Sequence, residues 1–118
     1  MTIANNQKYV LRFRAVNRDI FEAIKGGKKK VETRAATARY SKIKAGDLVV
    51  LMCGKNKFEK TVKRAGIFKT VSSMLGKYKV KDIMPNLSSA EELQQTYYGY
   101  PNYREKIRKF GLVVLELK

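Results

Sequence analysis

Residues 26–34 read GGKKKVETR and place a single carboxylate among four cations. Two adjacent glycines are typical of a helix end, and the β-branched residues after them favour a short strand. In a regular strand Lys30, Glu32 and Arg34 share one face, because side chains alternate between the two faces. Lys29 faces away from Glu32 by the same alternation, unless the strand begins after it. The stretch therefore predicts a helix-to-strand junction where Glu32 meets cations.

The residues around this junction show further alternating and helical patterns. Strands are predicted over 8–14, 30–34, 48–52, 56–71 and 112–117, and helices over 17–25, 72–78, 88–99 and 102–111. Gly66 indicates a bulge or bend within the longest strand. About five or six strands with three or four short helices predict an α+β fold. Their order fits a small curled sheet or open β-barrel better than a wound βαβ fold. We expect residues 1–118 to form one domain.

Charge is the strongest compositional signal. The chain has 26 Lys and Arg against 10 Asp and Glu, a net charge of +16. Such an excess attracts polyanions, and RNA or single-stranded nucleic acid is the partner we expect. The cations are spread over many elements and do not line one amphipathic helix, so a membrane surface fits less well. Without an apolar membrane span or a signal-peptide pattern, we expect a cytoplasmic protein, and a monomer is compatible with this reading.

Cysteine and histidine usage restricts the chemistry. Cys53 is the single cysteine, and the chain has no histidine. An internal disulfide and an ordinary zinc site are excluded, so we expect no metal and no cofactor. The commonest general base is absent as well, which removes every nucleophile that depends on a histidine.

One segment departs from the basic character of the rest. Residues 82–103 contain no Lys or Arg and carry only Asp82, Glu91 and Glu92, so one side of the protein should be neutral to acidic. Four tyrosines crowd its end, at positions 97, 98, 100 and 103. We expect two or three of them to pack in the interior. Tyr103, which precedes REKIRK, is the one expected to face a ligand, because an aromatic ring can stack on a base.

These features together resemble the ASCH domain family. Its signature G-x-K-x-x-E-x-R is matched by Gly27, Lys29, Glu32 and Arg34. The segments IKAGDLVVL, FKTVSSMLGKYKVKDIMPN and YYGYPNYREKIRKFGLVVLEL resemble later family blocks in the same order. The resemblance covers about residues 8–117 and implies a fold similar to that of PUA RNA-binding domains, with a cleft beside the barrel that receives the signature side chains.

The resemblance also implies a set of functions that all concern RNA. Some family members are binding modules, some are reported ribonucleases, and one branch deacylates a modified cytidine with a threonine at the position of Glu32. A glutamate lacks that hydroxyl, and Thr33 should face the other side of the strand, so the amidohydrolase reading is disfavoured. A ribonuclease would use Lys29 and Glu32 as proton donor and acceptor, which makes these two the catalytic candidates.

We therefore predict an RNA-binding module that recognises a nucleotide in a basic cleft, with an RNA-acting enzyme as the alternative. The expected nucleic-acid-binding residues are Lys28, Lys29, Glu32, Arg34, Lys55, Lys57, Arg64 and Tyr103. Two simpler readings stay open. Glu32 could be a solvated surface group of little energetic value. The lysines of the 55–69 region could protect an edge strand from aggregation.

Overall fold

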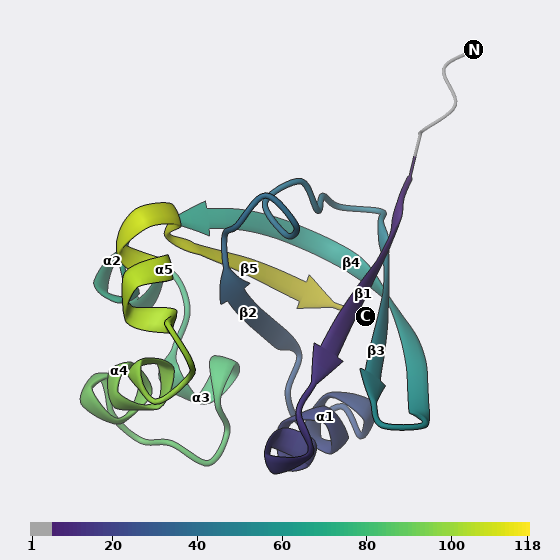
Figure 1. Cartoon of the computed structure of the whole chain (residues 1–118), viewed down its shortest axis with the longest axis horizontal. Helices are drawn as coiled ribbons and strands as arrows, with labels where there is room; N and C mark the ends of the chain where they lie inside the picture. Colours follow the sequence, from purple (N-terminus) through teal and green to yellow (C-terminus); the bar gives the residue numbers. More distant parts are fainter. Residues whose placement is uncertain (1–5) are drawn as a thin grey trace.

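The computed structural model describes residues 6–118, which form five strands, five α-helices and one 3₁₀ helix (Figure 1). The order is β1 (Lys8–Phe13), η1 (Ala15–Asn17), α1 (Arg18–Lys25), β2 (Val31–Ala35), β3 (Leu48–Cys53), β4 (Asn56–Phe68), α2 (Val71–Leu75), α3 (Val80–Ile83), α4 (Ala90–Tyr98), α5 (Tyr103–Phe110) and β5 (Leu112–Leu117). Within residues 6–118, no helix has the length and apolar character that a membrane crossing requires.

The five strands form one curved sheet in the order β1-β3-β4-β5-β2. β1 runs parallel to β3, and the other neighbouring pairs are antiparallel. β4 is long and bends across the molecule, so the sheet curls into a half-barrel with β1 and β2 as its two edges (Figure 1). The α+β open barrel predicted from the sequence is confirmed.

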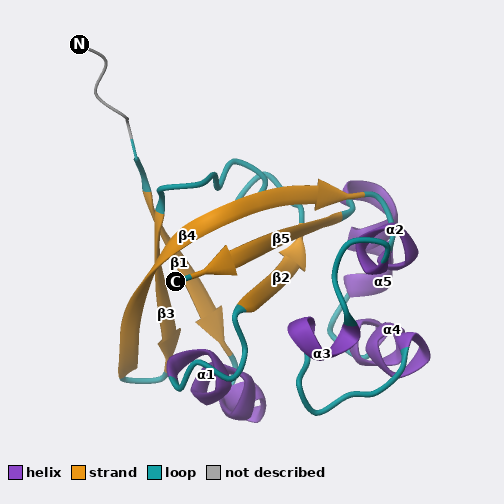
Figure 2. Ribbon diagram, turned by 180° about the vertical axis from the view of Figure 1, so that it is seen from behind, coloured by secondary structure: helices purple, strands orange, loops and turns teal. Residues whose placement is uncertain are grey.

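The helices pack on two sides of this half-barrel. α1 lies below the ends of β1 and β3, while α2, α3, α4 and α5 gather on the other side, beside β2 and β5 (Figure 2). There is one helix more than the upper number expected, because the 72–81 region forms two short helices. The second of them, α3, begins where the backbone N–H of Lys79 donates to the Asp82 carboxylate at 3.1 Å.

Two hydrophobic clusters result from this arrangement. The first fills the concave side of the half-barrel and includes Phe21 and Ile24 of α1. The second lies between β2, β5 and the later helices and includes Tyr97. β5 serves both clusters, with Leu115 facing the first and Val114 the second. Burial on both faces explains why its sequence LVVLEL is almost continuously apolar.

The irregularity in β4 is not at the predicted position. The register against β5 shifts between Val62 and Arg64, whereas Gly66 pairs regularly with Val114. The bulge expected at Gly66 was therefore wrong. An extra residue in one strand reverses the alternation of faces after it. This shift lets Val62 and Ala65, three positions apart, both pack on the first cluster.

Candidate functional site

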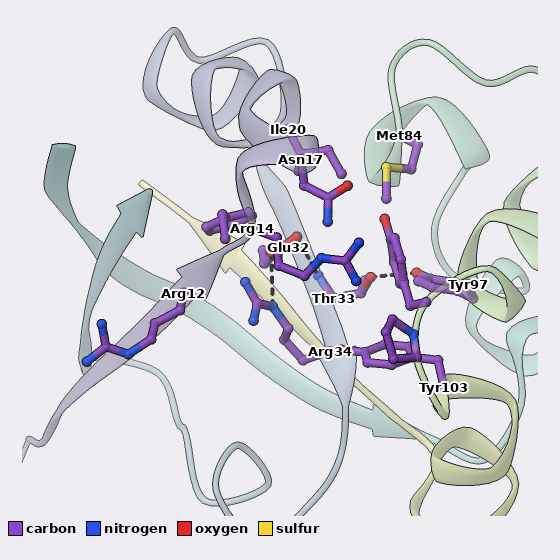
Figure 3. A pocket seen from close by; sticks show the side chains of 13 residues that line it. Arg12, Arg14, Asn17, Ile20, Glu32, Thr33, Arg34, Met84, Tyr97 and Tyr103 are labelled. Carbon is purple, nitrogen blue, oxygen red and sulfur yellow. Dashed lines mark hydrogen bonds and ion pairs between the residues drawn. The ribbon is translucent and has the colours of Figure 1, made fainter. Parts of the chain in front are cut away.

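A pocket of about 140 Å³ lies where the two edges of the half-barrel approach each other (Figure 3). The end of β1 and the start of α1 form one wall, β2 forms the floor, and the segment from α3 to α5 forms the opposite wall. The lining residues are Arg12, Phe13, Arg14, Asn17 and Ile20; Glu32, Thr33 and Arg34; and Met84, Tyr97, Tyr100, Pro101 and Tyr103. Three segments distant in sequence thus build one site.

The floor of the pocket holds an ion pair. Glu32 is 3% exposed, and its Oε2 accepts a hydrogen bond from Arg34 Nε at 3.2 Å. Its Oε1 accepts from the backbone N–H of Thr33 at 3.1 Å. Burial by itself would lower the pKa of Arg34, but Glu32, by its charge and its hydrogen bond, and the nearby Tyr103 and Tyr40 together outweigh burial and raise that pKa. Arg34 is therefore a fixed cation whose orientation is set by a carboxylate.

Aromatic rings support the Arg34 guanidinium as well. Its central carbon lies 4.7 Å from the ring centroid of Phe13 and 5.6 Å from that of Tyr40. Both distances are within the range of cation–π attraction. The guanidinium is thus held by one carboxylate and two rings, which leaves it little freedom to reorient.

Lys29 lies beneath the pocket and does not line it. It is 1% exposed, and its Nζ donates to the carbonyl oxygens of Val31, at 2.7 Å, and of Ile83. The same ammonium lies 3.5 Å from Glu32 Oε1. Because β2 begins only at Val31, Lys29 precedes the strand and turns under it. Burial lowers the pKa of Lys29, and the neighbouring Glu32 opposes that shift. Lys29 ties β2 to α3 and holds Glu32 from below.

The wall opposite β1 is made of tyrosines. The hydroxyls of Thr33 and Tyr97 share a hydrogen bond of 2.5 Å, and the backbone N–H of Ala35 donates to the Tyr103 hydroxyl at 3.4 Å. Tyr100 lies between the other two rings, with edge-on centroid distances of 6.4 Å to Tyr97 and 5.3 Å to Tyr103. Burial raises the pKa of Tyr100 to about 12. Its phenol therefore stays protonated at neutral pH and can donate a hydrogen bond.

The wall on the β1 side is basic. Arg14 reaches across the pocket toward Tyr97 (Figure 3). Among residues 6–118, none accepts a hydrogen bond from its guanidinium. Arg12 makes only a long contact to Met52 Sδ, at 3.8 Å. Arg14 is therefore an exposed cation that an anion in the pocket could reach, whereas the Arg12 guanidinium points away from the pocket toward Met52 of β3 (Figure 3).

The residues predicted for the site separate into three groups. Glu32, Arg34 and Tyr103 meet in the pocket. Lys29 lies under its floor. The rest lie outside the lining: Lys28 in the turn before β2, Lys55 in the turn between β3 and β4, and Lys57 and Arg64 on β4.

Several lining residues were missed by the sequence reasoning. Arg12 and Arg14 belong to the strand predicted over 8–14 but were not assigned to the site, and Thr33 had been expected to face the other side of its strand. Thr33 does face the helices, as alternation requires, but the pocket extends around β2 to include it. No sequence pattern shows that β1 and β2 are opposite edges of one sheet, and that fact decides which arginines face the pocket.

Two other hollows lie along the outer face of α4, and Glu91 and Gln94 line both. Neither hollow is lined by a Lys or Arg. An acidic surface repels polyanions, so these hollows are poorer candidates for nucleic acid than the pocket between β1 and β2.

Comparison with known proteins gives consistent results. The protein-family model for the ASCH domain matches residues 15–118. The chain is 28% identical to the crystal structure of "hypothetical protein PH0355", with a TM-score of 0.80, covering 94% of this chain and 97% of that one. It is also 28% identical to the solution NMR structure of protein PF0455 from Pyrococcus furiosus, with a TM-score of 0.72 and coverage of 94% and 96%. Among curated proteins, none matches this sequence significantly.

Proposed function

Because this chain belongs to the ASCH domain family, we propose that it is an RNA-binding module whose pocket receives one unpaired nucleotide of a single strand. The observation that carries the proposal is the arrangement around Arg34. A cation fixed by Glu32 lies beside three tyrosines, and the exposed Arg14 stands at the mouth (Figure 3). Aromatic rings and oriented cations are the groups that proteins use to hold a splayed base and its phosphates.

The interior of the pocket and its mouth are suited to different parts of a nucleotide. The interior, with Ile20, Met84 and the tyrosine rings, offers apolar cover for a base. Arg14 at the mouth is suited to an adjoining phosphate. Lys55 and Lys57, on the hairpin of β3 and β4, would extend the basic surface beyond the pocket. Contacts of this outer kind position the chain and are sensitive to salt.

We propose binding without catalysis, because the two catalytic candidates are already engaged. Lys29 Nζ has three acceptors around it, two carbonyls and Glu32. A lysine held in this way is not free to move a proton to a ligand. The Thr33 hydroxyl is bonded to Tyr97, and burial raises the pKa of Tyr97, so this phenol is a poor base for activating a nucleophile. These contacts fit structural roles better than chemical ones.

The test is binding of a fluorescently labelled single-stranded RNA, followed by anisotropy between about 50 and 200 mM salt. We expect Arg14→Ala to weaken binding by about fivefold and to reduce the slope of log affinity against log salt by about 0.7, the value for one lost phosphate contact on a single strand. Arg108→Ala is the matched control. It removes the same charge from the outer face of α5, where Arg108 pairs with Glu105 at 2.7 Å.

Two results would contradict the proposal. One is undetectable binding at the lowest salt. The other is an equal loss in the Arg14→Ala and Arg108→Ala variants, which would mean that only the total charge matters. Electrophoresis of the RNA after prolonged incubation should show intact chains, and cleavage that persists through repurification but is absent from a Lys29→Ala variant would favour the enzyme.

A further inference from the structure

Arg34 presents half of its guanidinium to the pocket. The Nε side donates to Glu32, while no residue within 6–118 accepts a hydrogen bond from either Nη group. The side chain is 12% exposed, and it is part of the pocket lining. The edge formed by the two Nη groups carries two parallel N–H donors in fixed geometry. Its natural complement is a pair of adjacent acceptors on one ligand.

Only some bases offer such a pair. Guanine has O6 next to N7, and cytosine has O2 next to N3. In adenine the acceptor N7 adjoins the donor amine at position 6. In uracil the two carbonyl oxygens are separated by a ring N–H, which is a donor. A rigid two-donor edge therefore fits guanine and cytosine and meets a donor in adenine and uracil.

A phosphate also offers paired acceptors, but the surroundings of Arg34 disfavour it. The Glu32 carboxylate lies 3.2 Å from Arg34 Nε and already balances its charge. A phosphate on the other edge would lose water and stand close to that carboxylate, which costs free energy. A neutral base edge avoids both penalties. The exposed Arg14, at the mouth, remains available for phosphate.

The size of the pocket agrees with a base as the occupant. A cavity of about 150 Å³ lined by apolar side chains holds a benzene ring. The pocket, at about 140 Å³, is close to that size and open on one side. Ile20 and Met84 provide apolar lining, and the tyrosine hydroxyls can bond polar groups that Arg34 does not reach.

We propose that Arg34 is a specificity-determining residue that selects a base with two adjacent acceptors, guanine or cytosine, over adenine and uracil. This inference rests on the proposed function of the pocket. The contact is made by the Nη edge, and the Glu32–Arg34 pair exists to hold that edge in position.

The experiment compares RNA pentamers of sequence UUNUU, which have the same phosphates and differ at the central base. We expect cytosine or guanine at the centre to bind about tenfold more tightly than adenine or uracil. A pentamer with an abasic centre should bind like the adenine and uracil chains. Replacing the central base by 3-deazacytosine or 7-deazaguanine removes one acceptor and should abolish the preference with the protein unchanged.

The protein side of the experiment uses Arg34→Lys, which keeps the charge but removes the paired donors. We expect the preference for cytosine and guanine to fall below about twofold while overall binding persists. Arg108→Lys, on the outer face of α5 and outside the pocket lining, is the matched control and should keep the preference. If Arg34→Lys does not fold, the deaza comparison on the native chain decides alone.

The outcomes distinguish this inference from the proposed function. Equal binding of all central bases, or deaza chains that bind like their parents, would overturn the role of Arg34 and leave RNA binding intact. A complete lack of binding by every pentamer and by longer single strands would overturn both.

Discussion

Lys29 shows how a conspicuous residue can act from beneath a site. It belongs to the basic run of residues 28–30, yet it is more buried than any other lysine described and is surrounded by hydrogen-bond acceptors. An ammonium in such a place is held by its partners, because a buried charge without them would be very unfavourable. We infer that Lys29 positions Glu32, and through it Arg34.

The first prediction concerns this lysine. Lys29→Met should reduce the free energy of unfolding by about 3 kcal/mol, since two buried carbonyls lose their donor and Glu32 loses one of its two cations. Urea unfolding measures the change. Lys28→Met is the matched control, because Lys28 is exposed, and its effect should stay within about 0.5 kcal/mol. Equal effects of the two substitutions would show that the contacts of Lys29 contribute nothing.

Individual site residues could be predicted from the sequence only where they belong to one local pattern. Glu32 and Arg34 were foreseen because they share one strand face, and Tyr103 because it borders a basic helix. Arg14 was not assigned to the site, since its position depends on the pairing of β1 with β3, far away in sequence. Local spacing carries no information about such distant pairing.

Gly111 joins α5 to β5, and its lack of a side chain lets this junction lie close against β4. Its φ is +80°, and a Cβ placed there would overlap the carbonyl oxygen of Phe68 on β4. Gly27, at the turn before β2, has almost the same φ, +82°, but an added Cβ would have nothing within 4 Å. An alanine at Gly27 would therefore introduce backbone strain alone, whereas an alanine at Gly111 would introduce backbone strain and steric overlap.

The second prediction uses this pair. Gly27→Ala should cost about 1 kcal/mol, the strain of a left-handed residue with a Cβ. Gly111→Ala should cost more than about 3 kcal/mol, because the strand or the helix must also shift. Thermal or urea unfolding provides both values. A Gly111→Ala variant as stable as Gly27→Ala would mean that the junction of α5 and β5 can move away from Phe68 of β4 at little cost.

Asp47 connects the start of β1 to the turn before β3. Its buried carboxylate accepts from the backbone N–H groups of Gln7 and Lys44 and from Lys44 Nζ, each at 2.9 Å. Burial alone would raise the pKa of Asp47, but these hydrogen bonds lower it below its ordinary value. A carboxyl with a depressed pKa stabilises the fold above its unfolded pKa, and that contribution disappears as the pH falls through the folded pKa.

The third prediction follows from this sign. Asp47→Asn should lower the free energy of unfolding by about 2 kcal/mol at neutral pH, because charge-assisted hydrogen bonds are replaced by weaker ones. The difference from the native chain should shrink as the pH falls below about 4. Asp19→Asn, at the exposed start of α1, serves as the control and should change stability by less than about 1 kcal/mol. A difference that stays constant with pH would contradict the role of the charge.

Secondary structure was largely predictable because each main element carries its own pattern. The alternation in KYVLRF is a local signal, and the strand that it predicts is confirmed. The cap of α4, Ser89 with Glu92, is local as well. The bulge in β4 was predicted at the wrong residue, because a strand can form a bulge without a glycine. The observed bulge allows Val62 and Ala65 to pack on the same hydrophobic cluster. That packing depends on the whole fold and cannot be recognised from the local sequence.

The curved sheet makes the two hydrophobic clusters interdependent. β5 buries Leu115 in the first cluster and the adjacent Val114 in the second. Loss of β5 would therefore disrupt the packing of both clusters. The sequence predicted one domain but gave no sign that its interior would divide into two clusters. We propose that residues 1–118 nevertheless fold as one cooperative domain.

The fourth prediction tests that cooperativity. Methyl NMR signals of Ile24, in the first cluster, and of Ile107, in the second, should vanish at the same urea concentration. The shared strand is the physical reason. Separate midpoints for the two signals would show that the clusters unfold independently and would contradict a single domain.

The strand that carries the site has one further property. Within residues 6–118, β2 is paired only with β5, the last strand of the chain, and one wall of the pocket comes from the helices just before β5. Glu32 and Arg34 are synthesised well before β5, and β2 has no strand partner among the described residues until residues 112–117 have also left the ribosome. During synthesis, the chain therefore cannot hold a ligand in this pocket until β5 has been made.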